Sequence, residues 1–401
     1  MSTSTPEFLK FTTHSFFTQR LVLSTLTGRP IHISQIHSSP TNPGLAPHEI
    51  SFLRLLDSVT NGSSLQISYT GTTLTYSPGL ITGGIAAGVS DVVKCTLPDT
   101  CRRGVSWFIL PLCMLAPFSK GPVNARFEGE GVITSATESG DVSVDTVRTA
   151  VLPLYEKFGI PGAKMEIRVL QRSCAGSGGK GGGGIVEVRF GAQVRLPKTL
   201  HMHRRPGRVK KVRGVAYATG VSASNNGRMI HAARSVLNAL VSDVHIAAQY
   251  DQAPLVPDKT NPSAKKRTGV GFGVCLVAES GVDGVVYSAD LAAPSEGGVT
   301  PEEIGKKAAW QLLEAIERGG CVSSVGVGTV LLLMAMGSED VGRIRLGRDV
   351  VGSEAAIGLG RDLKKFGASC WGLRDCEGDE TGDLIVSVKG VGIGNVGRKI
   401  V

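Results

Sequence analysis

Histidine is absent from the last 156 of the 401 residues, because His245 is the last of the eight histidines. The cysteines also lack the close sequence spacing that metal-binding pairs have. No CxxC pair occurs, and no histidine stands near the two closest couples, Cys95 with Cys101 and Cys370 with Cys376. These spacings do not fit a zinc site, so no metal is expected. Scattered cysteines in a large chain fit a reducing compartment, the cytosol or the nucleus.

Long apolar runs are lacking as well. No stretch of about 18 apolar residues exists, so no membrane span is expected. The longest run, residues 330–336, predicts a buried helix. The first ten residues lack the hydrophobic core of a secretory signal.

Glycine and positive charge are abundant instead. Glycine accounts for 53 of the 401 residues, or 13%, against about 7% in average proteins. Such a content indicates many tight turns between short elements. The net charge of +9 and the isoelectric point near 9.2 favour an acidic partner such as nucleic acid, although many soluble proteins are mildly basic. Hydrophobic and charged contents of 41% and 19% predict a sizeable core.

One local pattern recurs along the chain: an apolar 3–4 periodicity, a glycine or turn, and then a short alternating strand. Six such units imply repeated two-layer α/β modules with helices on one face of each sheet. The predicted helices are residues 49–59, 107–116, 144–158, 228–240, 302–318 and 352–366. Strands are predicted at 64–69, 122–128, 164–170, 244–250 and 369–373.

Two loops interrupt this rhythm. Residues 176–184 form a glycine-rich stretch with Lys180, which lacks the GxxxxGK[ST] pattern of a phosphate-binding loop and is predicted to be a hairpin connection. Residues 254–266 are predicted to be an exposed loop, and Lys265-Lys266-Arg267 within or beside it is either a nuclear address or a solvated run.

The most basic segment lies between these loops. Its cations suit a phosphate-binding surface, and the alternative is a charged loop leading into a strand at 212–221. The cations are Arg204, Arg205, Arg208, Lys210, Lys211 and Arg213. His201 and His203 beside them form an HxH pair without an evident third metal ligand, which favours surface histidines.

The N-terminal half carries specific motifs. Residues 20–30 read RLVLSTLTGRP, residues 42–45 read NPGL, and residues 76–84 read YSPGLITGG. Further on, SVDTVR at 143–148 is followed by LPLYEKFGI at 152–160. In this order the motifs resemble the RNA 3′-terminal phosphate cyclase superfamily over roughly residues 9–400. Four further motifs resemble its eukaryotic cyclase-like (Rcl) branch most: APFSK at 116–120, RGGCV at 318–322, LLLM at 331–334 and GVGIG at 390–394.

The resemblance implies an α/β fold of α+β layers. Repeated units of a four-stranded sheet and two helices would carry a smaller inserted α/β domain. The expected division is cyclase-like units at 1–194, the insert at 195–290, and the last cyclase-like unit at 291–401.

Two departures from the enzymes of that superfamily concern function. The cyclases begin with a glycine-rich segment that serves the nucleotide, and the matching residues 11–20 contain Phe16 and Phe17, which impede close backbone approach to phosphates. Cyclases also carry a histidine that takes AMP covalently, and the matching residues 324–329 offer only Ser, Val, Gly and Thr. His14 is the one conceivable substitute. No cofactor is therefore expected.

The resemblance then implies a ribosome-biogenesis factor without cyclase activity. The Rcl branch acts in early pre-rRNA processing for the small ribosomal subunit, in the nucleolar processome, and associates with a Bms-type GTPase. The same nucleolar location, partner GTPase and pre-rRNA contact are expected here. The basic segment 204–213 is the candidate docking surface for the GTPase.

Two enzymatic alternatives stay open. A pre-rRNA endonuclease would need a base and cations, which Arg361, Asp362 and Lys364 supply. The same residues also fit the solvated face of an amphipathic helix that buries Leu359, Leu363 and Phe366. The other alternative is an active ATP-dependent RNA 3′-phosphate cyclase.

A binding pocket could survive without chemistry. Arg20, Arg54 and Arg148 stand in family-like segments and are candidates to hold an anion or an RNA phosphate. Each fits equally well as a helix cap or as the partner of a carboxylate. Asp145 is predicted to be a first-turn acid favoured by the helix dipole.

Overall fold

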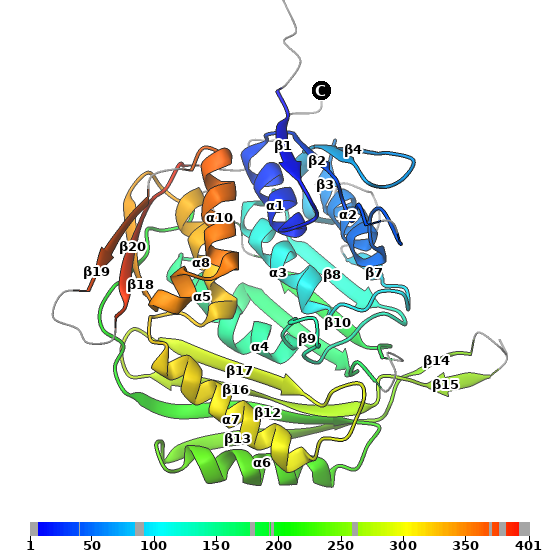
Figure 1. Ribbon diagram of the computed structural model, residues 1–401, viewed down its shortest axis with the longest axis vertical. Helices are drawn as coiled ribbons and strands as arrows, with labels where there is room; N and C mark the ends of the chain where they lie inside the picture. The colour runs from blue at the N-terminus through cyan, green and yellow to red at the C-terminus, as the bar shows by residue number, and fades with distance from the viewer. Residues whose placement is uncertain are drawn as a thin grey trace, which may run out of the picture.

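The computed structural model describes residues 7–39, 41–84, 92–176, 181–191, 193, 196–258, 264–368, 371–376 and 382–392. It confirms the predicted α/β fold, with four-stranded sheets and helices packed against them (Figure 1). Lys180 of the glycine-rich stretch, and Ile393 and Gly394 of the last motif, lie outside the described residues.

Three of the four-stranded sheets share one topology. In each, the first strand is parallel to the second, the second is antiparallel to the fourth, and the fourth is antiparallel to the third. The strand orders are β1-β2-β5-β4, β7-β8-β10-β9 and β11-β18-β20-β19. This shared order establishes three copies of one βαβαββ unit.

The first unit contains β1 (Leu9–Thr12), α1 (Phe17–Thr27), β2 (Ile31–Ser34), α2 (Pro47–Val59), β4 (Ser64–Ile67) and β5 (Leu74–Ser77). A two-stranded sheet of β3 (Thr60–Asn61) and β6 (Leu80–Ile81) closes it. Helix α1 ends at Gly28, whose φ of 68° is the left-handed conformation that commonly ends a helix.

The second unit contains β7 (Val93–Thr96), α3 (Ser106–Leu115), β8 (Val123–Glu128), β9 (Met165–Gln171) and β10 (Ile185–Phe190). Its second helix runs through α4 (Val144–Thr146), a π-helical turn (Val147–Val151) and α5 (Leu152–Lys157). Short 3₁₀ turns occupy Ala116–Phe118 and Gly162–Lys164.

The third unit begins with β11 (His201–Met202) and resumes after the insert with α8 (Ser324–Met336), β18 (Val341–Leu346), α9 (Arg348–Val351), α10 (Glu354–Lys365), β19 (Trp371–Asp375) and β20 (Leu384–Lys389). The apolar run at 330–336 lies in α8 and is buried, as predicted. Ser353 caps α10, since its hydroxyl accepts a hydrogen bond from the backbone N–H of Ala356.

The inserted elements are β12 (Val209–Thr219), α6 (Ser224–Leu237), β13 (Asp243–Asp251), β14 (Leu255–Pro257), β15 (Lys265–Arg267), β16 (Gly271–Ser280), β17 (Val286–Ala292) and α7 (Pro301–Glu317). Their sheet has the order β13-β12-β16-β17, which differs from the repeated unit. Helices α6 and α7 cover its outer face (Figure 1). A capping box between Thr300 and Glu303 starts α7.

The boundaries 1–194, 195–290 and 291–401 stay a prediction. The topology leads us to propose a longer insert, because β11 pairs with β18 of the third unit, whereas α7 packs on α6, β16 and β17. Two local details differ from expectation. Strand β12 begins at Val209 and so includes part of the basic segment, and residues 255–257 and 265–267 pair as a hairpin within the predicted loop.

Helices from all three units meet at the centre of the molecule. Helix α1 contacts α3, α3 contacts α8, α8 contacts α10, and α10 contacts α1 (Figure 1). The packing is possible because the facing sides are apolar, including Leu21 and Leu23 of α1, Leu112 of α3 and Leu332 of α8. These four helices carry the segments that the sequence singled out.

Candidate functional site

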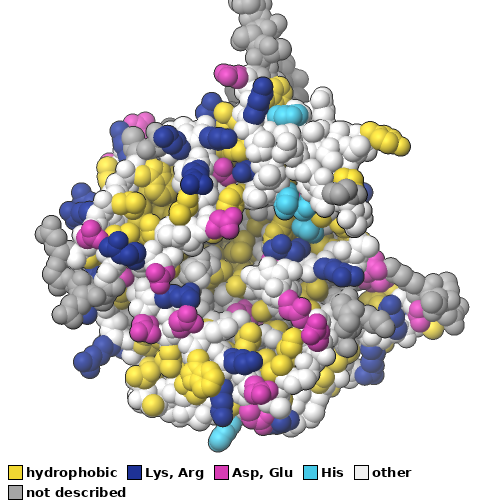
Figure 2. All heavy atoms as spheres, in the orientation of Figure 1, with side chains coloured by type: hydrophobic (Ala, Val, Ile, Leu, Met, Phe, Trp, Pro, Cys, Tyr) yellow, Lys and Arg dark blue, Asp and Glu magenta, His cyan; other side chains and the backbone are white. Residues whose placement is uncertain are grey.

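A cavity of about 250 Å³ lies where the four central helices meet. Trp107, Leu110 and Met114 of α3 form one apolar wall, and Val325 and Leu332 of α8 form another. Two further cavities adjoin it. One of about 330 Å³ shares the loop at residues 140–142 and extends to β17 and α7, and one of about 270 Å³ extends toward α9. Figure 2 shows a hollow in the middle of this face, with hydrophobic and charged side chains around it.

The segment matched to the nucleophile lies beside this central cavity. Val325 and Gly328 line it, while Ser324 is exposed and lines the neighbouring cavity toward α9. Thr329 is fully buried, and its side chain lies beside that of the buried Tyr155. None of the described residues that line either cavity is a histidine. An imidazole base for the serine or threonine here would have to come from outside the described residues that line these two cavities.

Phenylalanines occupy the segment that precedes α1. Phe17 is buried in the core, and Phe16 packs against α10 so closely that a Cβ on Gly358 would lie 2.3 Å from its ring. Phe16 itself has a φ of 57°, in the left-handed region. The Phe16 ring therefore fills space against α10, and the exclusion of phosphates from this segment stays a prediction.

Arg20 is held by Asp362 and not presented to a ligand. Its Nε donates to Asp362 Oδ2 at 3.3 Å, and its Nη1 donates to the carbonyls of Thr12 and Thr13. Gln19 Nε2 also donates to Asp362 Oδ2, at 2.8 Å. Burial raises the pKa of the Asp362 carboxyl, although Arg20 and Gln19 oppose that effect. The pair joins α1 to α10, which is a structural role.

The nuclease candidates Arg361, Asp362 and Lys364 are not brought together. Asp362 is buried against Arg20, whereas Arg361 and Lys364 are exposed to solvent. The amphipathic alternative requires a buried apolar face on this helix. That face is present, and its residues are Leu359, Leu363 and Phe366.

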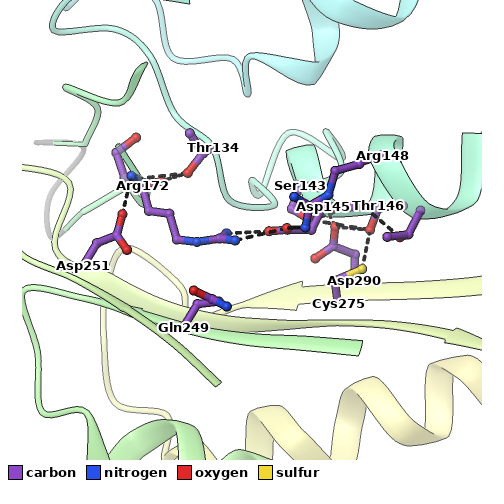
Figure 3. Close-up of polar contacts among 12 residues, drawn as sticks. Thr134, Ser143, Asp145, Thr146, Arg148, Arg172, Gln249, Asp251, Cys275 and Asp290 are labelled. Carbon is purple, nitrogen blue, oxygen red and sulfur yellow. Dashed lines mark hydrogen bonds and ion pairs between the residues drawn. The ribbon is translucent and has the colours of Figure 1, made fainter. Parts of the chain in front are cut away.

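Arg148 also pairs with a carboxylate, the alternative that the sequence left open. Its Nη2 donates to Asp145 Oδ1 at 2.9 Å. Asp145 is fully buried and is bound by a second arginine, Arg172, at 2.5 and 3.1 Å (Figure 3). Arg172 is itself buried, and its backbone N–H donates to Asp251 of the insert. Asp145 is in a first helical turn, as predicted, but these arginines are its main partners.

A second carboxylate, which is partly buried and lines the cavity of about 330 Å³, joins the insert to the second unit. Asp290 of β17 accepts hydrogen bonds from the backbone N–H of Ser143 at 2.5 Å and from Thr146 Oγ1 at 2.6 Å (Figure 3). Its other oxygen, Oδ1, is buried without a hydrogen-bond partner among the described residues. Burial raises the pKa of Asp290 to about 6, against the hydrogen bonds from Ser143 and Thr146.

The other candidate cations lie elsewhere. Arg54 is exposed on α2, away from the residues that line the central cavity. In the basic segment, Lys211 pairs with Glu279 at 2.8 Å and Arg213 pairs with Asp243 at 2.7 Å. Arg204, Arg205, Arg208 and Lys210 are exposed between β11 and the start of β12. Neighbouring strands therefore neutralise at least Lys211 and Arg213 of this segment.

Histidines gather near the central cavity, a feature that the spacing of the sequence did not reveal. The His14 ring stacks on His37 with 3.7 Å between centroids, and His37 Nε2 lies 3.1 Å from the buried Glu49 carboxylate. His48 packs edge-on against Trp107, and burial lowers the pKa of His48 to about 4. His14 does not line the central cavity, so the structure does not make it a substitute nucleophile.

Neither metal nor membrane sites emerge from the described ranges. Within them, no group of three or more His, Cys, Asp and Glu side chains could hold a metal ion, and no helix is long and apolar enough to cross a bilayer. The rings of His201 and His203 lie 6.3 Å apart at the surface end of the third unit. The described cysteines are free thiols, and most are buried; Cys370 lies outside the described residues.

Sequence reasoning missed three polar contacts near the cavities, those of Arg172, of Asp290 and of the His37–Glu49 pair. Arg172 follows an alternating strand and carries no periodic signal, and its partner Asp145 lies 27 residues away. Asp290 contacts Ser143, which lies 147 positions earlier in the chain, and Thr146, which lies 144 positions earlier. Only Glu49 had a local signal, since an acid three residues after Ala46 fits a helix start, where it accepts from the Ala46 N–H.

Comparison with known proteins gives consistent matches. A family model described as RNA 3′-terminal phosphate cyclase matches residues 9–359. The RNA 3′-terminal phosphate cyclase-like protein of Mus musculus is 40% identical over 83% of this chain and 82% of its own length. The rRNA processing protein RCL1 of Saccharomyces cerevisiae is 36% identical over the full length of both chains, and rRNA processing protein rcl1 of Schizosaccharomyces pombe is 36% identical over 99% of each.

Proposed function

Because this chain belongs to the RNA 3′-terminal phosphate cyclase family and no histidine is among the described residues that line its central cavity, we propose that it is an rRNA-processing factor that uses the fold for binding. Relatives named rRNA processing proteins, similar over essentially the whole chain, support the rRNA role. The net charge of +9 is consistent with contact to RNA.

The observation that carries this proposal is the pair of losses beside one cavity. Residues 324–329 provide no histidine, and Phe16 fills the space in front of α10 where a glycine-rich segment would admit phosphates. Cyclase chemistry would need both groups, a nucleophile and a phosphate cradle. The four contacting helices pack on one another through apolar sides and can serve as a scaffold.

We further propose that the protein acts in early processing of the small-subunit precursor, in the nucleolar processome and in association with a Bms-type GTPase. The support is the resemblance to the Rcl branch, together with the exposed cations Arg204, Arg205, Arg208 and Lys210 on a surface that a partner can reach. The docking surface for the GTPase on the insert remains our proposal.

The nuclease alternative is not part of this proposal. Its base is buried whereas its cations are exposed, and Asp362 is already bound by Arg20 and Gln19. A base buried in an ion pair cannot take a proton from an RNA 2′-hydroxyl without breaking that pair.

The test is depletion of the protein from cells, followed by rescue. Depletion should cause unprocessed small-subunit precursor rRNA to accumulate, and tagged protein should recover a GTPase and nucleolar RNA particles from nuclear extract. Rescue with Arg361→Ala/Lys364→Ala should restore processing, because these exposed residues are not proposed to cleave RNA. Normal precursor processing after depletion would refute the rRNA role, and failed rescue by a folded double variant would restore the nuclease alternative.

A further inference from the structure

A two-stranded arm projects from the insert. Strand β14 pairs antiparallel with β15, with Leu255 opposite Arg267 and Pro257 opposite Lys265. Figure 1 shows this pair of strands extending away from the sheet of β12, β13, β16 and β17. We call the described residues 255–258 and 264–267 the arm. It contains Lys265-Lys266-Arg267, the run that the proposed function has not yet used.

Further backbone hydrogen bonds join the two sides of the arm, and one of its strands borders the body of the protein. The Thr268 N–H donates to the Pro254 carbonyl at 3.0 Å, and the Asp258 N–H donates to the Ala264 carbonyl at 2.9 Å. Val256 is buried, and together with Leu255 and Pro257 it borders a cavity of about 510 Å³ that Leu97 and Pro98 of the second unit also line. Strand β14 therefore faces the body, and β15 is the outer strand.

All three residues of β15 are exposed. Because side chains alternate along a strand, Lys265 and Arg267 project from one face of the arm and Lys266 from the other. Within the described residues, none of the three makes an ion pair, although Asp99, Glu128 and Glu130 line the cavity that β14 borders.

Other cations of the insert differ in this respect. Lys211 is paired with Glu279, Arg213 with Asp243, and Arg228 with Glu302 at 2.6 Å. A phosphate that approached one of these residues would have to displace a carboxylate. At the arm, a phosphate displaces only mobile counterions, and that release is the main source of RNA affinity for cationic surfaces.

We propose that the arm is an RNA-binding element, in which Lys265, Lys266 and Arg267 contact phosphates of the RNA backbone. This inference rests on the proposed rRNA role and identifies a surface for it. A β-ribbon that is already ordered loses little conformational freedom when it binds, which favours a built element over a flexible basic tail.

The hairpin also argues against the use of this run as a nuclear address. In the arm, the backbone of β15 is paired with β14 along its whole length. A receptor that reads an extended peptide would have to separate the two strands first. The arm is therefore better suited to present side chains to RNA than to be bound as a linear segment.

The experiment compares two triple variants of the full-length protein. Lys265→Ala/Lys266→Ala/Arg267→Ala removes the three unpaired cations, and Lys211→Ala/Arg213→Ala/Arg228→Ala removes three paired cations from the same insert. Both lose three positive charges. Binding to a labelled RNA hairpin is measured between 50 and 200 mM salt, and the circular dichroism of each variant confirms its fold.

The arm variant should lose about 0.7 to 0.9 from the slope of log affinity against log salt for each contact removed. Over this fourfold range of salt, the factor by which its affinity falls should be about 20 to 40 times smaller than the factor for the wild type. The paired-cation variant should keep the wild-type slope. Equal slopes for the two variants would overturn the arm proposal, because net charge alone would then explain binding.

The outcomes separate this proposal from the proposed function. If wild-type protein does not bind the hairpin at any salt, the RNA role itself is in question. If wild type binds and the arm variant binds equally well, only the arm proposal fails. If the arm variant keeps its RNA affinity but no longer enters the nucleus, the run is a transport signal and the proposal is overturned.

Discussion

Replacement of Asp290 by asparagine should stabilise the protein at neutral pH and remove part of its pH dependence. Burial holds the pKa of Asp290 at about 6, whereas an aspartate in an unfolded chain titrates near 3.9. The folded state therefore binds more protons than the unfolded state between these values. Stability must then fall as pH rises through this window, because the charged carboxylate is buried at neutral pH.

The magnitude follows from the two pKa values. At pH 5.0 about nine-tenths of the folded molecules carry the proton, but less than a tenth of the unfolded chains do, and at pH 7.5 neither state does. Linkage then gives a contribution of about 1.4 kcal/mol between pH 5.0 and pH 7.5. The asparagine side chain of the variant keeps an oxygen to accept from Ser143 and Thr146 but has no charge to bury.

The assay is urea unfolding of wild type and Asp290→Asn at both pH values, followed by tryptophan fluorescence. The gain in the free energy of unfolding that the substitution brings should be larger at pH 7.5 than at pH 5.0 by about 1.4 kcal/mol. Asp283→Asn, which changes an exposed residue in the turn before β17, is the matched control and should show no such difference. An Asp290→Asn effect that is the same at both pH values would refute the reasoning.

Two further pairs of substitutions test the packing around the site. Gly358→Ala should destabilise the protein by about 1–3 kcal/mol, because the new methyl would overlap the Phe16 ring. Gly360→Ala in the same helix meets no atom within 4 Å and should stabilise the protein by about 0.5–1 kcal/mol. Denaturant unfolding of both variants measures these changes, and equal effects would contradict the prediction. Asp145→Ala should lower the free energy of unfolding by about 3–5 kcal/mol, because it leaves the buried Arg172 without its carboxylate. Arg148→Ala should lower it by at most about 1 kcal/mol, because the Arg148 side chain is 39% exposed. A similar loss for both variants would show that Asp145 does not depend on its buried partner.

Periodicity explains why the secondary structure was largely predictable. The apolar 3–4 spacing at residues 49–59 and 302–318 gave helices that begin within two residues of α2 and α7. The apolar run at 330–336 predicted a buried helix, and α8 is one. Such patterns are local, so they are visible in the sequence without knowledge of the fold.

The partners of the candidate arginines could not be predicted, because they depend on contacts between distant parts of the chain. Arg20 and Asp362 are 342 residues apart, and only the contact between α1 and α10 brings them together. Arg54 stands in a family-like segment, but Leu53 and Leu55 turn to the core and leave it on the outer side of α2. The local sequence therefore indicated which segments resemble the family, but not the side of the helix on which each arginine lies.

The basic segment shows the same limit for strands. Six cations in ten residues predict a phosphate-binding surface, yet Arg213 is neutralised by Asp243 of the neighbouring β13. Strand pairing decides which cations keep their charge available, and the pairing of β12 with β13 and β16 is not written in the local sequence. Among the described residues, the arm has no such neighbour on its outer strand, which is why its cations remain unpaired.

The most direct test of the central claim, a cyclase fold that binds without cyclase chemistry, is incubation of the purified protein with ATP labelled on the α-phosphate. Denaturing gel electrophoresis then shows any covalent adenylate, and an active cyclase of the same family serves as the positive control. We predict no label on this protein at any pH between 6 and 8, because residues 324–329 provide no histidine. A labelled band that survives denaturation would contradict the account and restore ATP-dependent cyclisation as its function.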